Sequence, residues 1–184
     1  AAYTAYGKLD GIALMVMGAF GVTATTFVGQ NFGAQKFDRM RKVVRWSLLL
    51  TAISTISLEI LLCVFAEPAM RLFSSDMDVI REGVRITRFL VPGYVLYMGI
   101  EVFAGTLRGT GDSFAPMLMT ALGVCVIRVP WVLIGAPYFK DIIDVLTCFP
   151  ITWGVTCALF VGYYLHGGWL KRRKIAMGFD VSEG

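Results

Sequence analysis

Charged residues are scarce in this 184-residue chain. Only 16 % of its residues are Asp, Glu, Lys or Arg, whereas 57 % are hydrophobic and the mean hydropathy is +0.68. A soluble domain carries about 25 % charged residues, because its surface helices and strands hide only one face from water. The composition therefore excludes an ordinary soluble domain and predicts an integral membrane protein.

The chain also has few of the residues that carry enzymatic or metal chemistry. It has one histidine, His166, and none of the HExxH, GxSxG or paired-aspartate patterns that would support a membrane enzyme. Its four cysteines lack the close paired spacing of a zinc or redox site, so we interpret them as buried thiols: Cys63, Cys125, Cys148 and Cys157. We expect no enzyme activity, no metal site and no cofactor.

Long apolar runs are abundant. A membrane-spanning helix needs about 20 mostly apolar residues, and the sequence provides five such segments. They cover residues 11–35, 46–66, 89–107, 113–139 and 145–170. We therefore predict an all-α, polytopic membrane protein with five transmembrane helices.

The cations cluster beside these runs. The net charge of +4 and the pI of about 9.0 would suggest nucleic-acid binding in a soluble chain. Here, five cations lie within residues 36–45, directly after the first span, and residues 171–174 read Lys-Arg-Arg-Lys after the last. Because Lys and Arg accumulate beside spans on the cytoplasmic side, we predict that both stretches are cytoplasmic and expect no nucleic-acid partner.

Three charged residues fall inside the predicted spans, namely Glu59, Glu101 and Arg128. A lipid-facing arginine at mid-membrane costs about 2.5 to 3.5 kcal/mol, so we expect Arg128 to point into the helix bundle and to pair with Glu101 or Glu59. Glu59 lies in the outer third of its span, where it reaches the headgroups or faces a cavity. Gln30 and Asn31, near the end of the first span, cap the helix, meet water or line a cavity.

Glycine marks the positions where the helices bend, turn or approach each other. Pro92 and Gly93 interrupt the third span and free backbone carbonyls, which is tolerable at membrane depth only where protein or a water-filled cavity covers them. After this span comes a loop that is either a tight cytoplasmic turn or a pivot, built from Arg108, Gly109, Thr110, Gly111 and Asp112. The GxxxG spacing of Gly29 and Gly33 would let a neighbouring helix approach closely.

Three stretches resemble the multidrug and toxic compound extrusion (MATE) transporter family. They are residues 26–36 (TFVGQNFGAQK), 72–89 (LFSSDMDVIREGVRITRF) and 101–117 (EVFAGTLRGTGDSFAPM). In the family, similar stretches lie at the end of the eighth helix, before the tenth helix and at the junction of the tenth and eleventh helices. The resemblance implies the C-terminal lobe of a twelve-helix, two-lobed prokaryotic transporter. The chain opens with Ala1, without Met or a basic apolar leader, so we expect a piece of a longer protein.

The resemblance implies secondary antiport, in which inward flow of Na⁺ or H⁺ drives export of cationic or amphipathic compounds by alternating access. In some members, a carboxylate on the tenth helix one turn after a tyrosine belongs to a cation site, and Glu101 with Tyr97 is similar. The implied partners are the lipid bilayer of the bacterial inner (plasma) membrane, small organic cations or drugs, and N-terminal helices of the same protein. A lipid-linked-oligosaccharide flippase of the same superfamily and a non-transporting fragment remain alternatives.

Overall fold

The computed structural model describes residues 2–179, which form helices and short connections without a β-strand. The helices are α1 (Ala2–Gly33), α2 (Phe37–Val64), α3 (Ala66–Arg71), α4 (Met77–Leu90), η1 (Val91–Gly93), α5 (Tyr94–Gly109), α6 (Phe114–Gly135), η2 (Ala136–Tyr138), α7 (Ile142–Leu146), α8 (Cys148–His166) and α9 (Gly168–Ala176).

Five helical segments are long and apolar enough to cross a membrane, which confirms the predicted all-α class. They are Ala2–Gly33, Phe37–Val64, Met77–Gly109, Phe114–Tyr138 and Ile142–His166. The first three begin earlier than predicted, because the helices extend beyond the apolar runs into the charged residues that precede them. The last ends at His166 and not at residue 170, because Gly167 adopts a left-handed φ of 72° and the Lys-Arg-Arg-Lys sequence forms the separate helix α9.

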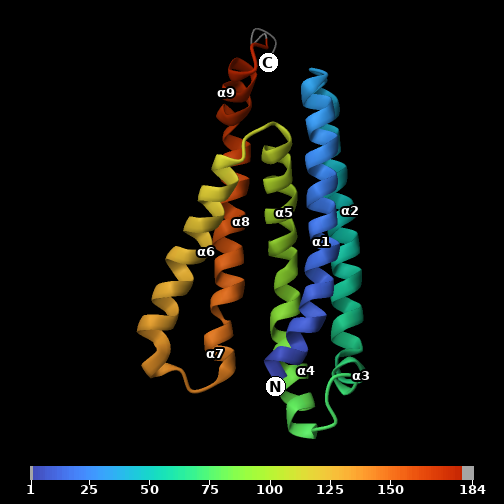
Figure 1. Cartoon of the computed structure of the whole chain (residues 1–184), viewed down its shortest axis with the longest axis vertical. Helices are drawn as coiled ribbons and strands as arrows, with labels where there is room; N and C mark the ends of the chain where they lie inside the picture. The colour runs from blue at the N-terminus through green and yellow to red at the C-terminus, as the bar shows by residue number, and fades with distance from the viewer. Residues whose placement is uncertain (1, 180–184) are drawn as a thin grey trace.

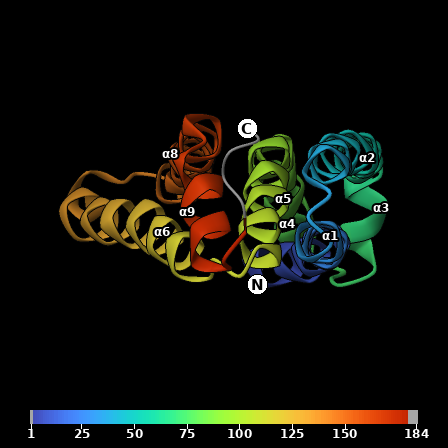
Figure 2. The same cartoon turned by 90° about the horizontal axis from the view of Figure 1, so that it is seen from above.

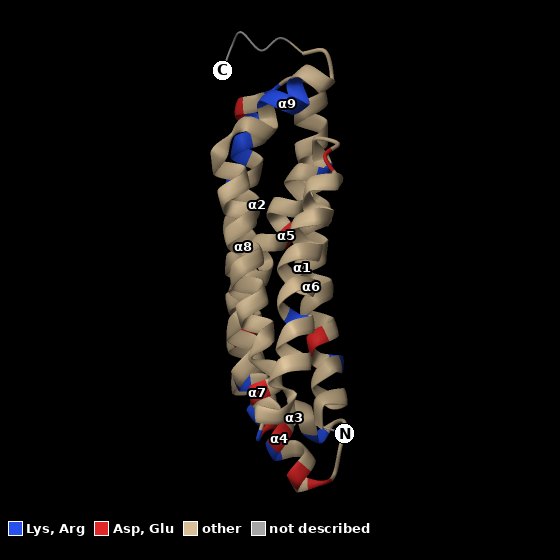
Figure 3. Ribbon diagram, turned by 90° about the vertical axis from the view of Figure 1, so that its left-hand side faces the viewer, with Lys and Arg blue, Asp and Glu red and all other residues tan. Residues whose placement is uncertain are grey.

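Helix α5 occupies the middle of the bundle (Figures 1 and 2). It contacts α1 and α2 on one side and α8 on the other, while α6 packs mainly on α8. The fully buried side chains include Met17, Val28, Tyr94, Leu107 and Phe160 of the three central helices α1, α5 and α8. Charged residues gather at the two ends of the long helices (Figure 3). This distribution suits a bundle whose middle lies in lipid.

The outer helices expose large apolar side chains. On α2 these include Ile53, Ile56 and Ile60, and on α6 they include Val126, Leu133 and Ile134. In water such a surface would promote association, whereas in a bilayer it is solvated by acyl chains. These faces of α2 and α6 are therefore suited to contact with lipid or with other membrane helices.

Glycine brings α1 and α5 together. A Cβ atom added to Gly105 would lie 2.3 Å from the carbonyl oxygen of Gly21, and one added to Gly109 would lie 2.6 Å from that of Thr25. The backbones of α1 and α5 therefore touch where neither helix carries a large side chain, as expected for small residues between membrane helices. The GxxxG prediction was half right: Gly29 lies against Gly109, but no atom of another helix within residues 2–179 lies within 4 Å of a Cβ added to Gly33.

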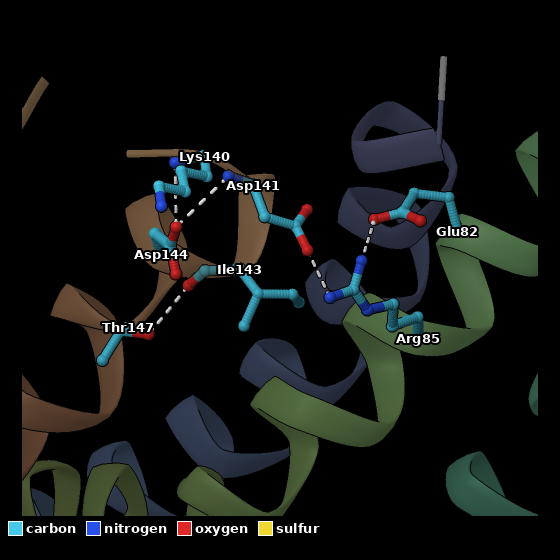
Figure 4. Close-up of polar contacts among 7 residues, drawn as sticks. All are labelled: Glu82, Arg85, Lys140, Asp141, Ile143, Asp144 and Thr147. Carbon is cyan, nitrogen blue, oxygen red and sulfur yellow. Dashed lines mark hydrogen bonds and ion pairs between the residues drawn. The ribbon is translucent and has the colours of Figure 1, made fainter. Parts of the chain in front are cut away.

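The end of the bundle away from the basic clusters is tied by charge between α4 and the start of α7 (Figure 4). Arg85 pairs with Asp141 and also lies 3.5 Å from Glu82. Asp144 accepts hydrogen bonds from the backbone N–H groups of Lys140 and Asp141, which begins α7 with a capping box. The hydrogen bond from Arg85 lowers the pKa of Asp141. The ion pair between Arg85 and Asp141 therefore persists at neutral pH and weakens when the pH falls far enough to protonate Asp141.

We expect Gly105→Ala to destabilise the protein by about 1 to 3 kcal/mol, because the new methyl group overlaps the Gly21 carbonyl. Gly162→Ala is the matched control: Gly162 is exposed on α8, and no atom lies within 4 Å of its added Cβ. Thermal unfolding of the intact protein in detergent measures both. Equal midpoints for the two variants would contradict the packing described here.

Candidate functional site

Glu101 of α5 lies in the seam between α5 and α1. The Tyr97 hydroxyl donates a hydrogen bond of 3.0 Å to Glu101 Oε1, and Arg108 Nη2 lies 3.9 Å from Oε2. The Glu101 side chain is 22 % exposed, and a Cβ added to Gly21 would lie 2.8 Å from Oε2. The missing side chain of Gly21 thus leaves room for a carboxylate inside an apolar span.

The Pro92–Gly93 sequence changes the helix type without ending the helix. Residues Val91–Gly93 form a 3₁₀ turn between α4 and α5, and Met77–Gly109 is one span. Gly93 makes room for an indole ring, because an added Cβ would lie 2.8 Å from Trp153 of α8. The expected interruption is therefore a local tightening of the helix, at which Trp153 packs on Gly93 while Pro92 is exposed.

Glu59 of α2 binds the first turn of α5, the helix that follows the 3₁₀ turn. Its Oε1 accepts a hydrogen bond of 3.1 Å from the backbone N–H of Val95, in the first turn of α5. An anion is favourable there, because the first N–H groups of a helix have no intrahelical acceptor. Glu59 therefore binds α2 to α5, and the prediction that it could pair with Arg128 was wrong.

Arg128 of α6 faces α8, as expected of an arginine inside a span. Its guanidinium carbon lies 4.1 Å from the centre of the Phe149 ring, and its Nε and Nη2 each lie 3.3 Å from Thr152 Oγ1. No carboxylate pairs with it within residues 2–179, so the predicted ion pair with Glu101 or Glu59 was wrong. An aromatic face and a hydroxyl satisfy the cation instead.

Gln30 and Asn31 do not cap α1 through their side chains. Asn31 Nδ2 donates to the Phe27 carbonyl at 2.7 Å within the helix, and the Gln30 side chain is exposed. The helix ends through its backbone, where Gln35 adopts a φ of 55° and Lys36 N–H bonds to the Asn31 carbonyl at 2.8 Å. Asn31 does line a groove of about 520 Å³ between α1 and α2, together with Phe27, Arg39, Lys42, Trp46 and Leu50.

The glycine loop after α5 is a closed turn. Gly111 has a φ of 81°, Asp112 N–H bonds to the Leu107 carbonyl at 3.0 Å, and Asp112 Oδ1 accepts the N–H of Ala115 at 3.1 Å. Glycine is needed at position 111 because a side chain is strained at that φ. Asp112 thus binds the first turn of α6, which begins at Phe114, and its Oδ2 also lies 3.3 Å from the hydroxyl of Tyr163 on α8.

Helix α9 holds this turn from the C-terminal side. Arg173 Nε donates to the Thr110 carbonyl at 3.0 Å, and a Cβ added to Gly111 would lie 2.4 Å from Arg173 Nη2. Its neighbour Lys174 is 6 % exposed and lies 3.9 Å from the centre of the Phe37 ring at the start of α2. The basic helix therefore connects the α5–α6 turn to α2.

A second acid in the α1–α5 seam was missed because Asp10 lies just before the predicted first span. Tyr6 and Tyr94 both donate to Asp10 Oδ1, from α1 and α5 respectively. The signal was available in the sequence: Tyr6 and Asp10 have the same spacing as Tyr97 and Glu101. One helical turn separates a tyrosine from an acid in both cases.

The sequence profile of the MatE family matches residues 1–134. The chain belongs to the MatE family. Its relatives include probable multidrug resistance protein YoeA of Bacillus subtilis, 26 % identical over 167 residues that make up 89 % of this chain and 36 % of the relative. Probable multidrug resistance protein NorM of Thermotoga maritima is 28 % identical over 131 residues, 70 % of this chain and 28 % of that protein.

A third relative has a different cargo in its name. The FAD transporter of Shewanella oneidensis is 27 % identical over 169 residues, 90 % of this chain and 36 % of that protein. The chain thus spans about a third of the length of these relatives. Together with the five apolar helices, the family makes the chain part of a multi-pass membrane protein.

For this MatE-family protein, we expect Arg173→Gln to loosen the turn at residues 109–112, because it removes the donor to the Thr110 carbonyl. Amide hydrogen exchange in this turn should accelerate by roughly fivefold to tenfold, as expected for loss of about 1 to 1.5 kcal/mol. Lys171→Gln on the exposed side of α9 is the control and should leave exchange unchanged. Equal exchange in both variants would show that Arg173 does not hold the turn.

Proposed function

We propose that this chain is part of a multidrug efflux antiporter that couples inward flow of H⁺ or Na⁺ to export of small cationic or amphipathic compounds. The hydrogen-bonded Tyr97–Glu101 pair in the apolar α1–α5 seam carries the proposal. A partly buried carboxylate inside a membrane span is costly, and such residues commonly mark ion or proton pathways. The names of the relatives from Bacillus subtilis and Thermotoga maritima support drug efflux.

Arg108 competes with an incoming cation for Glu101. Its guanidinium lies 3.9 Å from the Glu101 carboxylate, and its side chain is half exposed. A proton or Na⁺ that binds Glu101 therefore weakens the attraction between Glu101 and Arg108. Arg108 directly precedes the Gly109–Asp112 turn, so its release acts on the segment that joins α5 to α6. Cation binding at Glu101 thereby favours a different position of this turn, which is the pivot that alternating access requires.

The rest of the transporter comes from outside this chain. Alternating access needs two groups of helices that move against each other around a site, and the chain spans about a third of its relatives' length. The partners in this proposal are N-terminal helices of the same protein, the lipid of a bacterial inner membrane and the drug. Arg128 gives little support to a flippase for anionic lipid-linked sugars, since its guanidinium is engaged by Phe149 and Thr152.

In the intact protein, Glu101→Gln should abolish ion-driven export while substrate binding and expression remain. The amide keeps an acceptor for Tyr97 but can neither carry the charge nor release a proton. Glu67→Gln is the control, because Glu67 is an exposed acid of α3 paired with Arg71. Drug efflux from energised proteoliposomes measures both variants. If Glu101→Gln exports like the parent across the physiological pH range, Glu101 is structural.

The orientation has its own test. In a background without the four native cysteines, Lys36→Cys and Lys171→Cys should react with an impermeant thiol reagent only after the cells are opened. Lys140→Cys should react in intact cells, because Lys140 is exposed at the opposite end of the bundle. Labelling of position 36 or 171 in sealed cells would reverse the proposed topology.

A further inference from the structure

Asp10 is half-buried beside two buried tyrosines, and the mechanism above does not use this cluster. Tyr6 and Tyr94 are 3 % and 1 % exposed, and their hydroxyl oxygens lie 3.0 Å apart. The Tyr6 hydroxyl lies 3.1 Å from Asp10 Oδ1, and the Tyr94 hydroxyl donates to the same oxygen. Three oxygen atoms from two helices thus form a triangle in which each lies within hydrogen-bonding distance of the other two.

The number of protons in this triangle determines which hydrogen bonds its three oxygen atoms can form. Each phenol carries one proton and an ionised carboxylate carries none, so the anionic cluster has two protons for three oxygen-to-oxygen contacts. Once both tyrosines donate to Asp10, the contact between the two tyrosines contains no proton. Protonation of Asp10 supplies the third proton, and each oxygen can then donate to one neighbour and accept from the other. Each of the two phenol protons therefore has an acceptor in the charged state, and each of the three protons has one in the neutral state.

The cluster lies near the membrane surface opposite the basic stretches 36–45 and 171–174. Asp10 precedes Gly33 by 23 residues, which is roughly 34 Å along α1 and about the thickness of the hydrocarbon core. It precedes Gly21, which touches Glu101, by 11 residues or roughly 16 Å. Along the α1–α5 seam, an ion that enters from that surface therefore meets Asp10 before Glu101.

The charged and titratable groups around Asp10 are few. Tyr97 on α5 and Tyr3 on α1 lie within electrostatic range of its carboxylate, and Tyr3 also lies within range of Arg128 on α6. From α2, Glu59 binds the N–H of Val95, next to Tyr94. On α4, Arg85 forms its ion pairs with Glu82 and Asp141 and none with Asp10. No cation within residues 2–179 forms an ion pair with Asp10.

A proton suits this cluster better than a metal ion. Hard cations such as Ca²⁺ and Mg²⁺ take six or more oxygen ligands, whereas the cluster presents three oxygens that already touch one another. Within residues 2–179, no group of three or more His, Cys, Asp or Glu side chains could hold a metal.

We propose that Asp10, with Tyr6 and Tyr94 as hydrogen-bond partners, is a second proton-binding site at the outer end of the α1–α5 seam. The site takes up a proton from the outer surface before the proton reaches Glu101. This order, Asp10 before Glu101, rests on the proposed antiport, whereas proton binding by Asp10 does not. A purely structural role would keep Asp10 ionised as a tie between α1 and α5.

Infrared difference spectroscopy of the intact protein in lipid distinguishes the two roles. In a Glu101→Gln background, acidification should produce the carbonyl-stretch band of a protonated carboxyl group, and Asp10→Asn should remove part of that band. Glu67→Gln is the control for an exposed acid that titrates in water. Identical bands with Asp10 and with Asn at position 10 would overturn the proposal.

Tyr94→Phe provides a second measurement that holds even if Asp10→Asn fails to fold. It removes one of two donors to the carboxylate, and hydrogen bonds to a charged acceptor are the stronger ones. The carbonyl-stretch band of protonated Asp10 should therefore shift in frequency in this variant, because the hydrogen bonding of its carboxyl group changes. A band of unchanged frequency would contradict the proposal. If Glu101→Gln exports normally but the Asp10 band is present, the proposed antiport fails and the proton site stands.

Discussion

The polar chemistry of this bundle depends on the close approach of α1 and α5. Lipid tails are as apolar as the helix surfaces, so the hydrophobic effect does little to bring two helices together inside a membrane. Contact between the backbones at Gly21, Gly105 and Gly109 replaces it with van der Waals packing. The same contact brings Glu101 against Gly21 and Tyr94 against Asp10. A wider seam would separate Glu101 from Gly21 and Asp10 from Tyr94.

Features set by neighbouring residues were predictable from the sequence. Apolar run length gave the five spans, because a spanning helix must satisfy its backbone internally over a fixed thickness. The one-turn spacing of Tyr97 and Glu101 was enough to expect their hydrogen bond. The same local logic applies to the turn after α5, where Gly111 has a left-handed φ and Asp112 accepts an N–H from the first turn of α6. Whether Glu101 moves ions stays a prediction.

Contacts between residues of different helices were not predictable from the sequence. Arg128 was expected to meet an acid, but its neighbour α8 offers Phe149 and Thr152. Glu59 was judged by its depth alone, yet its partner is an N–H group 36 residues away on α5. Asp10 lay outside the predicted span, and only the position of Tyr94, 84 residues later, makes it part of a polar cluster between α1 and α5. Charge and hydropathy limit where such a residue can be, but packing decides what it touches.

Helix α9 also sets an order of events during synthesis. The turn at Gly111 and the Phe37 ring are made early, but the side chains that hold them, Arg173 and Lys174, belong to the last helix. Thr110 and Arg173 are 63 residues apart, which is from about 3 to about 13 s of translation at about 5 to 20 residues per second. Until α9 emerges from the ribosome, the α5–α6 turn is held by its own backbone bonds and its contact with α8. The contacts of α9 with this turn and with Phe37 therefore form only after the five apolar helices described here have been made.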